Sequence, residues 1–106
     1  MCPTENAVDS AIASTTLDLL IHEAARLKVV AVLNEAESAD FNYLLSVTGL
    51  TRGNLSTHMA KLVKGGYVEE HKEFVGRKPH TDYILTAAGK KAYREYLKAW
   101  RNLTKL

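Results

Sequence analysis

The sequence contains a single cysteine, Cys2, and only two prolines among its 106 residues. One cysteine cannot form a disulfide within the chain, so nothing points to an oxidising compartment. The N-terminus lacks a basic segment followed by an apolar one, which argues against a signal peptide. The longest uninterrupted apolar stretch, Val29 to Leu33, is far too short to span a membrane. We therefore expect a cytoplasmic protein with no membrane partner.

Motifs of enzymes and of metal proteins are also missing. The sequence has no nucleophile elbow and no glycine-rich phosphate loop, and its four histidines show neither HxH nor HExxH spacing. His71 and His80 would face each other across a hairpin, but a third metal ligand would then have to be Glu69, Glu73 or Asp82. We therefore predict no enzymatic activity, no cofactor and no metal site.

The composition is that of a folded domain, with 46% hydrophobic and 25% charged residues. The length suits one domain, and a domain this small buries only about two-thirds of its unfolded surface, so dimerisation would stabilise it. Residues 1–50 hold two basic and seven acidic residues, a net charge of −5, whereas residues 51–106 hold twelve basic and five acidic residues, a net charge of +7. This asymmetry points either to a polyanionic partner for the second half or to a solvated basic surface.

Hydrophobic periodicity divides the chain into a polar arm and a helical domain. Residues 1–15 are polar and weakly periodic and are predicted to be a flexible arm, whereas residues 16–106 are predicted to form the domain. Apolar residues at helical spacing predict a helix from Leu17 to about Ala36, with room for a shorter helix before it. A short helix is predicted from Ala39 to Gly49, with Asp40 as its N-cap and Gly49 as its end. Its expected buried residues are Phe41, Leu44, Leu45 and Val47.

The second half of the chain is predicted to form a helix, a hairpin and a last helix. Thr51 is the expected N-cap of a helix over residues 52–64, which Gly65-Gly66 terminates. Strands are predicted over residues 67–74 and 81–85, with residues 76–80 as the loop, and Pro79 is placed in the loop because it cannot donate to a strand ladder. Thr86 is the expected cap of a last helix over residues 87–103. This order predicts a mainly α fold with a small β-hairpin wing, a winged helix-turn-helix.

The helix over residues 52–64 is the predicted DNA-reading element. The second helix of a helix-turn-helix pair fits the major groove, where its N-terminal residues meet base edges. Arginine binds guanine and asparagine binds adenine through two hydrogen bonds, while lysines further along sense phosphate charge. Capping or plain solvation would also explain the polar residues at the helix start. The predicted contacts on this helix are Thr51, Arg52, Asn54, Ser56, Thr57, His58, Lys61 and Lys64.

Two further surfaces are predicted to serve DNA binding. The wing over residues 75–80 carries Arg77, Lys78 and His80, which suit the phosphate backbone or the minor groove, although charge at a hairpin tip also guards against edge pairing. The last helix carries an apolar stripe that either covers the core or forms a two-fold homodimer, with two reading helices about one DNA turn apart. The predicted dimer residues are Leu17, Leu20, Tyr93, Tyr96, Leu97, Trp100 and Leu103.

As a whole, residues 20–100 resemble the winged helix-turn-helix regulators of the MarR/ArsR broad group. The resemblance rests on Gly49-Leu50-Thr51-x-Gly53-Asn54-Leu55-Ser56-x-His58-Met59-x-x-Leu62, Gly66-Tyr67-Val68, Gly76-Arg77-Lys78-Pro79 and Tyr83-x-Leu85-Thr86. It implies a dimeric transcriptional regulator of double-stranded DNA, with the recognition helix in the major groove and the wing on backbone or minor groove. The domain lacks the cysteine thiolates of ArsR-type sensors and the longer terminal helices of MarR-type proteins, so the resemblance assigns no effector. The alternative function is a winged-helix module for protein–protein interaction.

Overall fold

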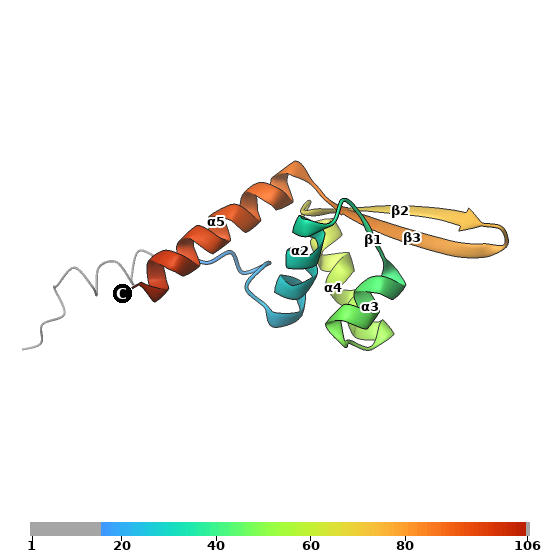
Figure 1. Ribbon diagram of the computed structural model, residues 1–106, viewed down its shortest axis with the longest axis horizontal. Coiled ribbons are helices and arrows are strands. Elements are labelled where there is room, and N and C mark those ends of the chain that lie inside the picture. The colour runs from blue at the N-terminus through green and yellow to red at the C-terminus, as the bar shows by residue number, and fades with distance from the viewer. Residues whose placement is uncertain (1–15, 106) are drawn as a thin grey trace, which may run out of the picture.

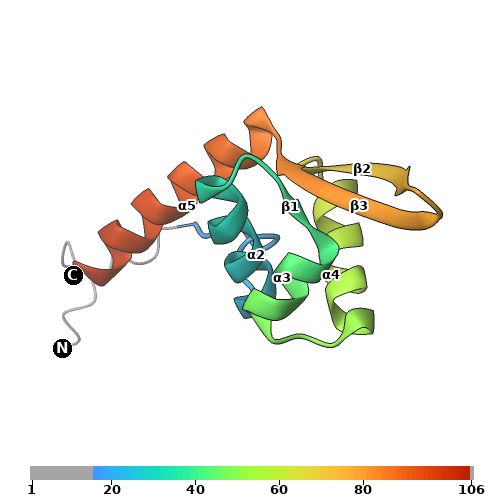
Figure 2. The ribbon, with the colours of Figure 1, turned by 45° about the vertical axis from the view of Figure 1, so that its right-hand side comes forward.

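The protein is described by a computed structural model that covers residues 16–105, and the predicted arm at residues 1–15 lies outside the described residues. Three helices pack together, and from them a β-hairpin and a long last helix extend in opposite directions (Figure 1, Figure 2). This is the predicted mainly α fold with a hairpin wing, a winged helix-turn-helix. In chain order, the elements are α2 (Ala24–Glu35), β1 (Ala39–Asp40), α3 (Phe41–Thr48), α4 (Arg52–Lys64), β2 (Val68–Val75), β3 (Lys78–Leu85) and α5 (Ala87–Thr104).

The first described helix, α2, begins at Ala24, so the predicted start at Leu17 was wrong. The carboxylate of Asp18 accepts hydrogen bonds from the backbone N–H groups of Leu20 (2.9 Å) and Ile21 (3.4 Å), which folds this segment into a turn. Such side-chain bonds compete with the helical backbone pattern. Ile21 is nevertheless fully buried, so the apolar residues at helical spacing pack inward without being helical. Glu23 then caps α2 by accepting from the backbone N–H of Arg26 at 3.0 Å.

The second helix, α3, has the predicted cap and the predicted end. The Asp40 carboxylate accepts from the backbone N–H of Tyr43 at 2.6 Å, and Gly49 adopts a left-handed conformation with φ of 70°. Only glycine enters that conformation without a steric penalty. The predicted burial of Val47 was wrong, because its side chain is 45% exposed and Thr48 is buried instead. The Thr48 hydroxyl donates to the carbonyl of Leu44 at 2.7 Å, which satisfies it inside the core.

The third helix, α4, spans the predicted residues 52–64. The Thr51 hydroxyl accepts from the backbone N–H of Asn54 at 3.2 Å and so caps the helix, as predicted. One face of α4 packs against α2 and β2, and the fully buried side chains on it each stabilise the fold by about 1.5–3 kcal/mol. The core consists of Val29, Val30, Leu33, Ala39, Leu44, Leu55, Met59, Leu62, Val68, Tyr83 and Leu85.

The sheet has three antiparallel strands in the order β1-β3-β2. The two-residue strand β1 was not predicted, and it pairs Ala39 with Tyr83 and Asp40 with Asp82. The hairpin between β2 and β3 is longer than predicted, because the loop shrinks to the two-residue turn 76–77. Gly76 has a φ of 66°, and none of the described non-glycine residues has a positive φ. The first turn residue, Gly76, therefore has a positive φ and the second, Arg77, a negative one, which is the pattern of a type II′ turn.

Pro79 lies inside β3, so its predicted place in the loop was wrong. It pairs with Phe74, one step beyond the Val75–Lys78 pair that closes the two-residue turn. The closing pair of such a hairpin exchanges hydrogen bonds, so the next pair does not, and the proline nitrogen points away from β2. Strand β1 pairs only with residues 82 and 83, so Pro79 faces an open edge, where a missing N–H costs nothing.

The last helix, α5, begins at its predicted cap. The Thr86 hydroxyl accepts from the backbone N–H of Gly89 at 3.0 Å and donates to the carbonyl of Gly66 at 2.7 Å, which ties the helix to the end of α4. Gly89 is buried against the carbonyl group of Tyr67, where no side chain fits. Within residues 16–105, no helix is long and apolar enough to cross a membrane.

Candidate nucleic-acid interface

The outer face of α4 is polar and basic. Asn54, Ser56 and Thr57 are exposed on it, on the side opposite to the buried Leu55 and Met59. The helix carries no acidic residue, and its first turn in particular has none. The N-terminus of a helix attracts anions through its free N–H groups and its dipole, so an acid-free first turn leaves that attraction intact. The exposed residues of α4 thus form a surface suited to a polyanion, and they include the predicted Thr51, Arg52, Lys61 and Lys64.

Arg52 stands at the junction of α3 and α4. Its Nη2 donates to the side-chain oxygen of Asn42 at 3.2 Å, and its guanidinium lies over the ring of Phe41, 5.8 Å from the ring centroid. These two contacts hold the side chain without burying it. A guanidinium has five N–H donors, so four remain for a further partner. Arg52 is therefore both oriented and available.

The other polar side chains at the start of α4 differ in their freedom. The hydroxyl of Thr57 donates to the carbonyl of Gly53 at 3.0 Å, and that of Thr51 is occupied by capping. In the part of the chain that the structure describes, the Asn54 side chain has no hydrogen-bond partner in the protein. Its amide can both donate and accept, which is the requirement for reading an adenine.

His58 differs from the rest of the predicted set because its side chain is directed at α2. Its Nδ1 lies 3.0 Å from Nη1 of Arg26 and 3.6 Å from a carboxylate oxygen of Glu23. The backbone N–H of Arg26, which donates to the Glu23 carboxylate, holds the pKa of that carboxyl below its usual value. This network joins α4 to the start of α2. DNA contact by His58 stays a prediction, and it would require His58 to leave these partners.

The wing carries two of its basic residues at the tip, whereas Lys72 on β2 lies 3.5 Å from a carboxylate oxygen of Glu70. Arg77 lies in the turn and Lys78 begins β3, and both are exposed. His80 is half-buried, and its Nε2 lies 3.0 Å from Oδ1 of Asp82. Two apolar side chains beside the turn are also exposed, Phe74 by 75% and Val75 by 61%. These two were not among the residues predicted from the sequence, although apolar side chains directly before Gly76 are a visible signal.

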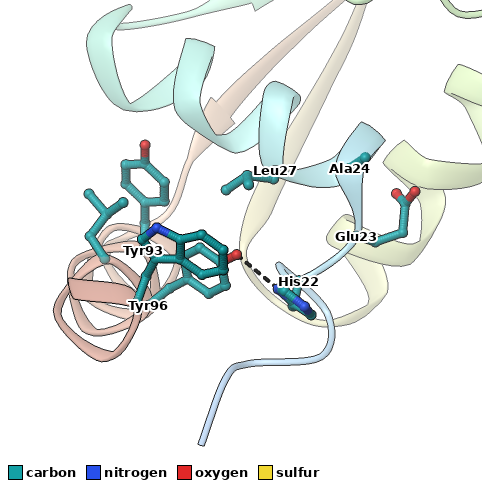
Figure 3. Close-up of a pocket in the computed structure, with 8 residues that line it drawn as sticks. His22, Glu23, Ala24, Leu27, Tyr93 and Tyr96 are labelled. Atoms are coloured by element: carbon teal, nitrogen blue, oxygen red, sulfur yellow. Dashed lines mark hydrogen bonds between the residues drawn. The ribbon is translucent and has the colours of Figure 1, made fainter. Parts of the chain in front are cut away.

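A groove of about 500 Å³ separates α5 from the start of α2 (Figure 3). His22 and Tyr96 meet across it, with Nδ1 of His22 2.9 Å from the Tyr96 hydroxyl. Trp100, further along α5, is 43% exposed. The residues lining the groove are His22, Glu23, Ala24, Leu27, Tyr93, Tyr96, Leu97 and Trp100.

The structure brings four of the seven predicted dimer residues together at this groove, namely those on α5 from Tyr93 to Trp100. Tyr96 is buried within the chain, whereas Leu103 is half-buried near the end of α5. Leu17 and Leu20 are half-buried on the turn before α2, and Leu20 packs against Gly65 of the same chain. Part of the predicted dimer surface therefore serves the fold of the single chain.

Comparison with known proteins places the chain in a family. It is 33% identical over 78 residues to an uncharacterized protein of Methanocaldococcus jannaschii, which covers 74% of this chain and 85% of that protein. Among solved structures, it is similar to a transcriptional regulator homologue from Pyrococcus horikoshii OT3, with a TM-score of 0.78 and 22% identity over 92% of this chain and 94% of the other.

A protein of Halomicrobium mukohataei with a GntR superfamily winged-helix-turn-helix domain has a TM-score of 0.59 and 25% identity over 81% of this chain and 67% of that one. Residues 25–104 match the family described as "Winged helix DNA-binding domain". That match spans α2 to the end of α5 and so includes the helix-turn-helix, the wing and the last helix. The chain therefore belongs to the winged helix DNA-binding domain family, and it is a DNA-binding protein rather than an enzyme.

Proposed function

We propose that this protein is a transcriptional regulator that works in the cytoplasm and binds duplex DNA as a homodimer. Helix α4 enters the major groove, and the tip of the β2–β3 hairpin contacts the adjacent backbone or the minor groove. The observation that carries the proposal is the outer face of α4, which is exposed, basic and free of acidic residues over its whole length. A major groove admits one α-helix with its N-terminal residues toward the bases.

Base reading falls to Arg52 and Asn54, two exposed side chains at the start of α4. Arg52 is held by Asn42 and Phe41 and keeps four donors free, which suits a guanine. Asn54 keeps its whole amide free for an adenine. Lys61 and Lys64 lie further along the same helix, where they contribute phosphate attraction without base selection. Ser56 and Thr57 complete the proposed contacts of this helix.

The wing contributes the two basic residues at its tip. Arg77 occupies a turn that only the left-handed Gly76 makes this tight, so the guanidinium is presented at the extreme end of the hairpin. Arginine at such a tip enters narrow, A/T-rich minor grooves, where the negative potential is strongest. Lys78, the first residue of β3, then lies next to the phosphate backbone.

Dimerisation through α5 supports the same function. The helix extends away from the bundle on the side opposite the wing (Figure 1), so it can pair with a second copy without covering α4. The exposed Trp100 and the groove beside it offer an apolar surface for that copy, and aromatic side chains are enriched in such interfaces. A two-fold dimer places two α4 helices on successive turns of a pseudo-palindromic site.

Fluorescence anisotropy with the duplex upstream of the gene tests these assignments by substitution. Asn54→Ala should cost about 1–3 kcal/mol of binding free energy and relax the preference at one base pair. Lys64→Ala should weaken binding to every duplex and lower the salt slope by about 1. Lys28→Ala is the matched control, because Lys28 is an exposed lysine on α2 and belongs neither to α4 nor to the wing. Equal effects of Lys28→Ala and Lys64→Ala would contradict the proposed orientation.

One observation favours the alternative function, a module for protein–protein interaction. Phe74 and Val75 expose apolar surface beside the wing tip, where DNA contact needs only charge. In that case Phe74→Ser would abolish capture of a protein partner and leave DNA affinity unchanged. Under the DNA proposal, Arg77→Ala lowers DNA affinity.

A further inference from the structure

Three potential metal ligands meet where the wing joins the helices. Asp40 ends β1, and His80 and Asp82 lie two residues apart on β3, so His80 and Asp82 share one face of the sheet. The strand register pairs Asp40 directly with Asp82, which places all three on that face. One ligand atom from each of the three lies within 4.8 Å of the others, and all three residues are half-buried.

We propose that Asp40, His80 and Asp82 bind a divalent transition-metal cation, for which Zn²⁺ is the probe. Ligand atoms lie about 2.0–2.2 Å from a bound zinc, so two of them are separated by roughly 3–3.5 Å. Nε2 of His80 and Oδ1 of Asp82 are already 3.0 Å apart, so this pair needs little movement to share one ion. Asp40 then only has to close in from the neighbouring strand.

The chemistry of the ligand set selects the class of cation. Two carboxylates and an imidazole form a mixed oxygen and nitrogen site. Such a site favours Zn²⁺ or Mn²⁺ over Ca²⁺, which prefers oxygen ligands alone. Three protein ligands leave a coordination position open for water. The site is compatible with the fold, because Asp40 uses Oδ1 to cap α3 and keeps its second oxygen for the ion. Arg52 lines the same small cavity as Asp40 and His80, so its positive charge opposes the cation that the two carboxylates attract.

This site differs from the arrangement considered from the sequence, in which His71 and His80 face each other across the hairpin. The register places His71 opposite Asp82, not opposite His80, and His80 opposite Glu73. His71 instead contacts Glu69 on its own strand at 3.2 Å. No metal site was predicted from the sequence, and the strand that brings Asp40 beside Asp82 was not predicted either.

A cation at this position would link the wing to the helix-turn-helix. Asp40 belongs to the start of α3, whereas His80 and Asp82 belong to β3, so one ion joins the two parts that meet DNA in the proposed function. Its coupling to DNA binding rests on that proposed function. Metal binding itself does not, and it can be measured without DNA.

Isothermal titration of the metal-free full-length protein with Zn²⁺ tests the site directly. We expect one ion per chain, and His80→Ala or Asp82→Asn should weaken binding at least tenfold, since loss of even an outer-shell partner costs about 10–100-fold. Asp40→Asn removes a ligand charge while asparagine still caps α3, so it should weaken binding with the helix intact. Circular dichroism without metal confirms that each variant folds.

His22→Ala is the matched control, because His22 is an exposed histidine that lies before α2 and outside the sheet. It should leave Zn²⁺ affinity unchanged. The proposal is overturned if micromolar Zn²⁺ gives no binding, if His80→Ala binds as the wild type does, or if His22→Ala weakens binding as much as His80→Ala. A failure of metal binding alongside normal DNA binding would leave the proposed function standing.

Discussion

Replacing Gly89 with alanine should destabilise the protein, although alanine is the better helix former. Gly89 is the third residue of α5 and is buried. A Cβ at this position would overlap the carbonyl oxygen of Tyr67 and lie 2.8 Å from Cδ1 of Leu85. The Tyr67 carbonyl is fixed, because it accepts a hydrogen bond from the backbone N–H of Thr86 at 3.0 Å. A backbone group cannot rotate away as a flexible side chain would, so α5 must shift.

The size of the effect follows from two opposing contributions. Alanine in place of glycine favours a helix interior by about 0.8–1.0 kcal/mol. Inserting a methyl group into a packed site costs about 1–3 kcal/mol. Because the obstacle is a fixed backbone carbonyl, the cost lies in the upper part of that range, at about 2–3 kcal/mol. The clash therefore prevails, with a net loss of about 1–2 kcal/mol in the free energy of unfolding. For a domain of this size, that lowers the melting temperature by about 5–15 °C.

Gly53→Ala is the matched control, because the same substitution there meets no obstacle. Gly53 is the second residue of α4, and a Cβ on it has nothing within 4 Å. This variant should keep or raise the melting temperature, because the helix preference of alanine adds at most roughly 1 kcal/mol to the free energy of unfolding. Thermal denaturation of both variants, followed by circular dichroism, gives the two signs. Equal stability of Gly89→Ala and the wild type would refute the close approach of α5 to Tyr67.

Three other substitutions have defined outcomes. Glu23→Gln should lower stability at neutral pH but not in acid. The pKa of Glu23 is lowered by the backbone N–H of Arg26, so its contribution is present above the usual value of 4.5 and is lost as the pH falls below it, and the urea unfolding curves of variant and wild type should converge in acid. Tyr67→Phe should cost about 1.5 kcal/mol in urea unfolding, because it removes the hydrogen bond to Asp18 that raises the pKa of Tyr67 to about 12. Trp100→Asp should convert a dimer into a monomer by light scattering, and an unchanged mass would contradict dimerisation through α5.

The caps and the exposed face of α4 were predictable because their signals are local. Asp40, Thr51 and Thr86 each bind a backbone N–H three residues ahead, as the sequence predicted. The division of α4 into a buried and an exposed side follows from its periodicity, which a helix of 13 residues displays fully. These features need no knowledge of distant parts of the chain.

The errors arise where distant residues or competing local bonds decide the structure. Asp18 makes a turn that periodicity alone reads as helix, and the place of Pro79 in β3 depends on which side of the strand stays unpaired. The contact of His58 with Arg26 joins residues 32 positions apart, and the pairing of Asp40 with Asp82 joins residues 42 apart. No sequence pattern in one chain reports such contacts, so the site could be predicted by element but not by side-chain direction.

The central claim is that the outer face of α4 reads a specific duplex. The most direct test is fluorescence anisotropy with the native upstream duplex and a scrambled duplex of the same composition, across a salt series. We expect a preference of about a thousandfold for the native duplex, with affinity for both duplexes falling as salt rises. Equal binding to the two duplexes would contradict sequence reading by α4, and no binding to either at low salt would contradict DNA binding by this chain.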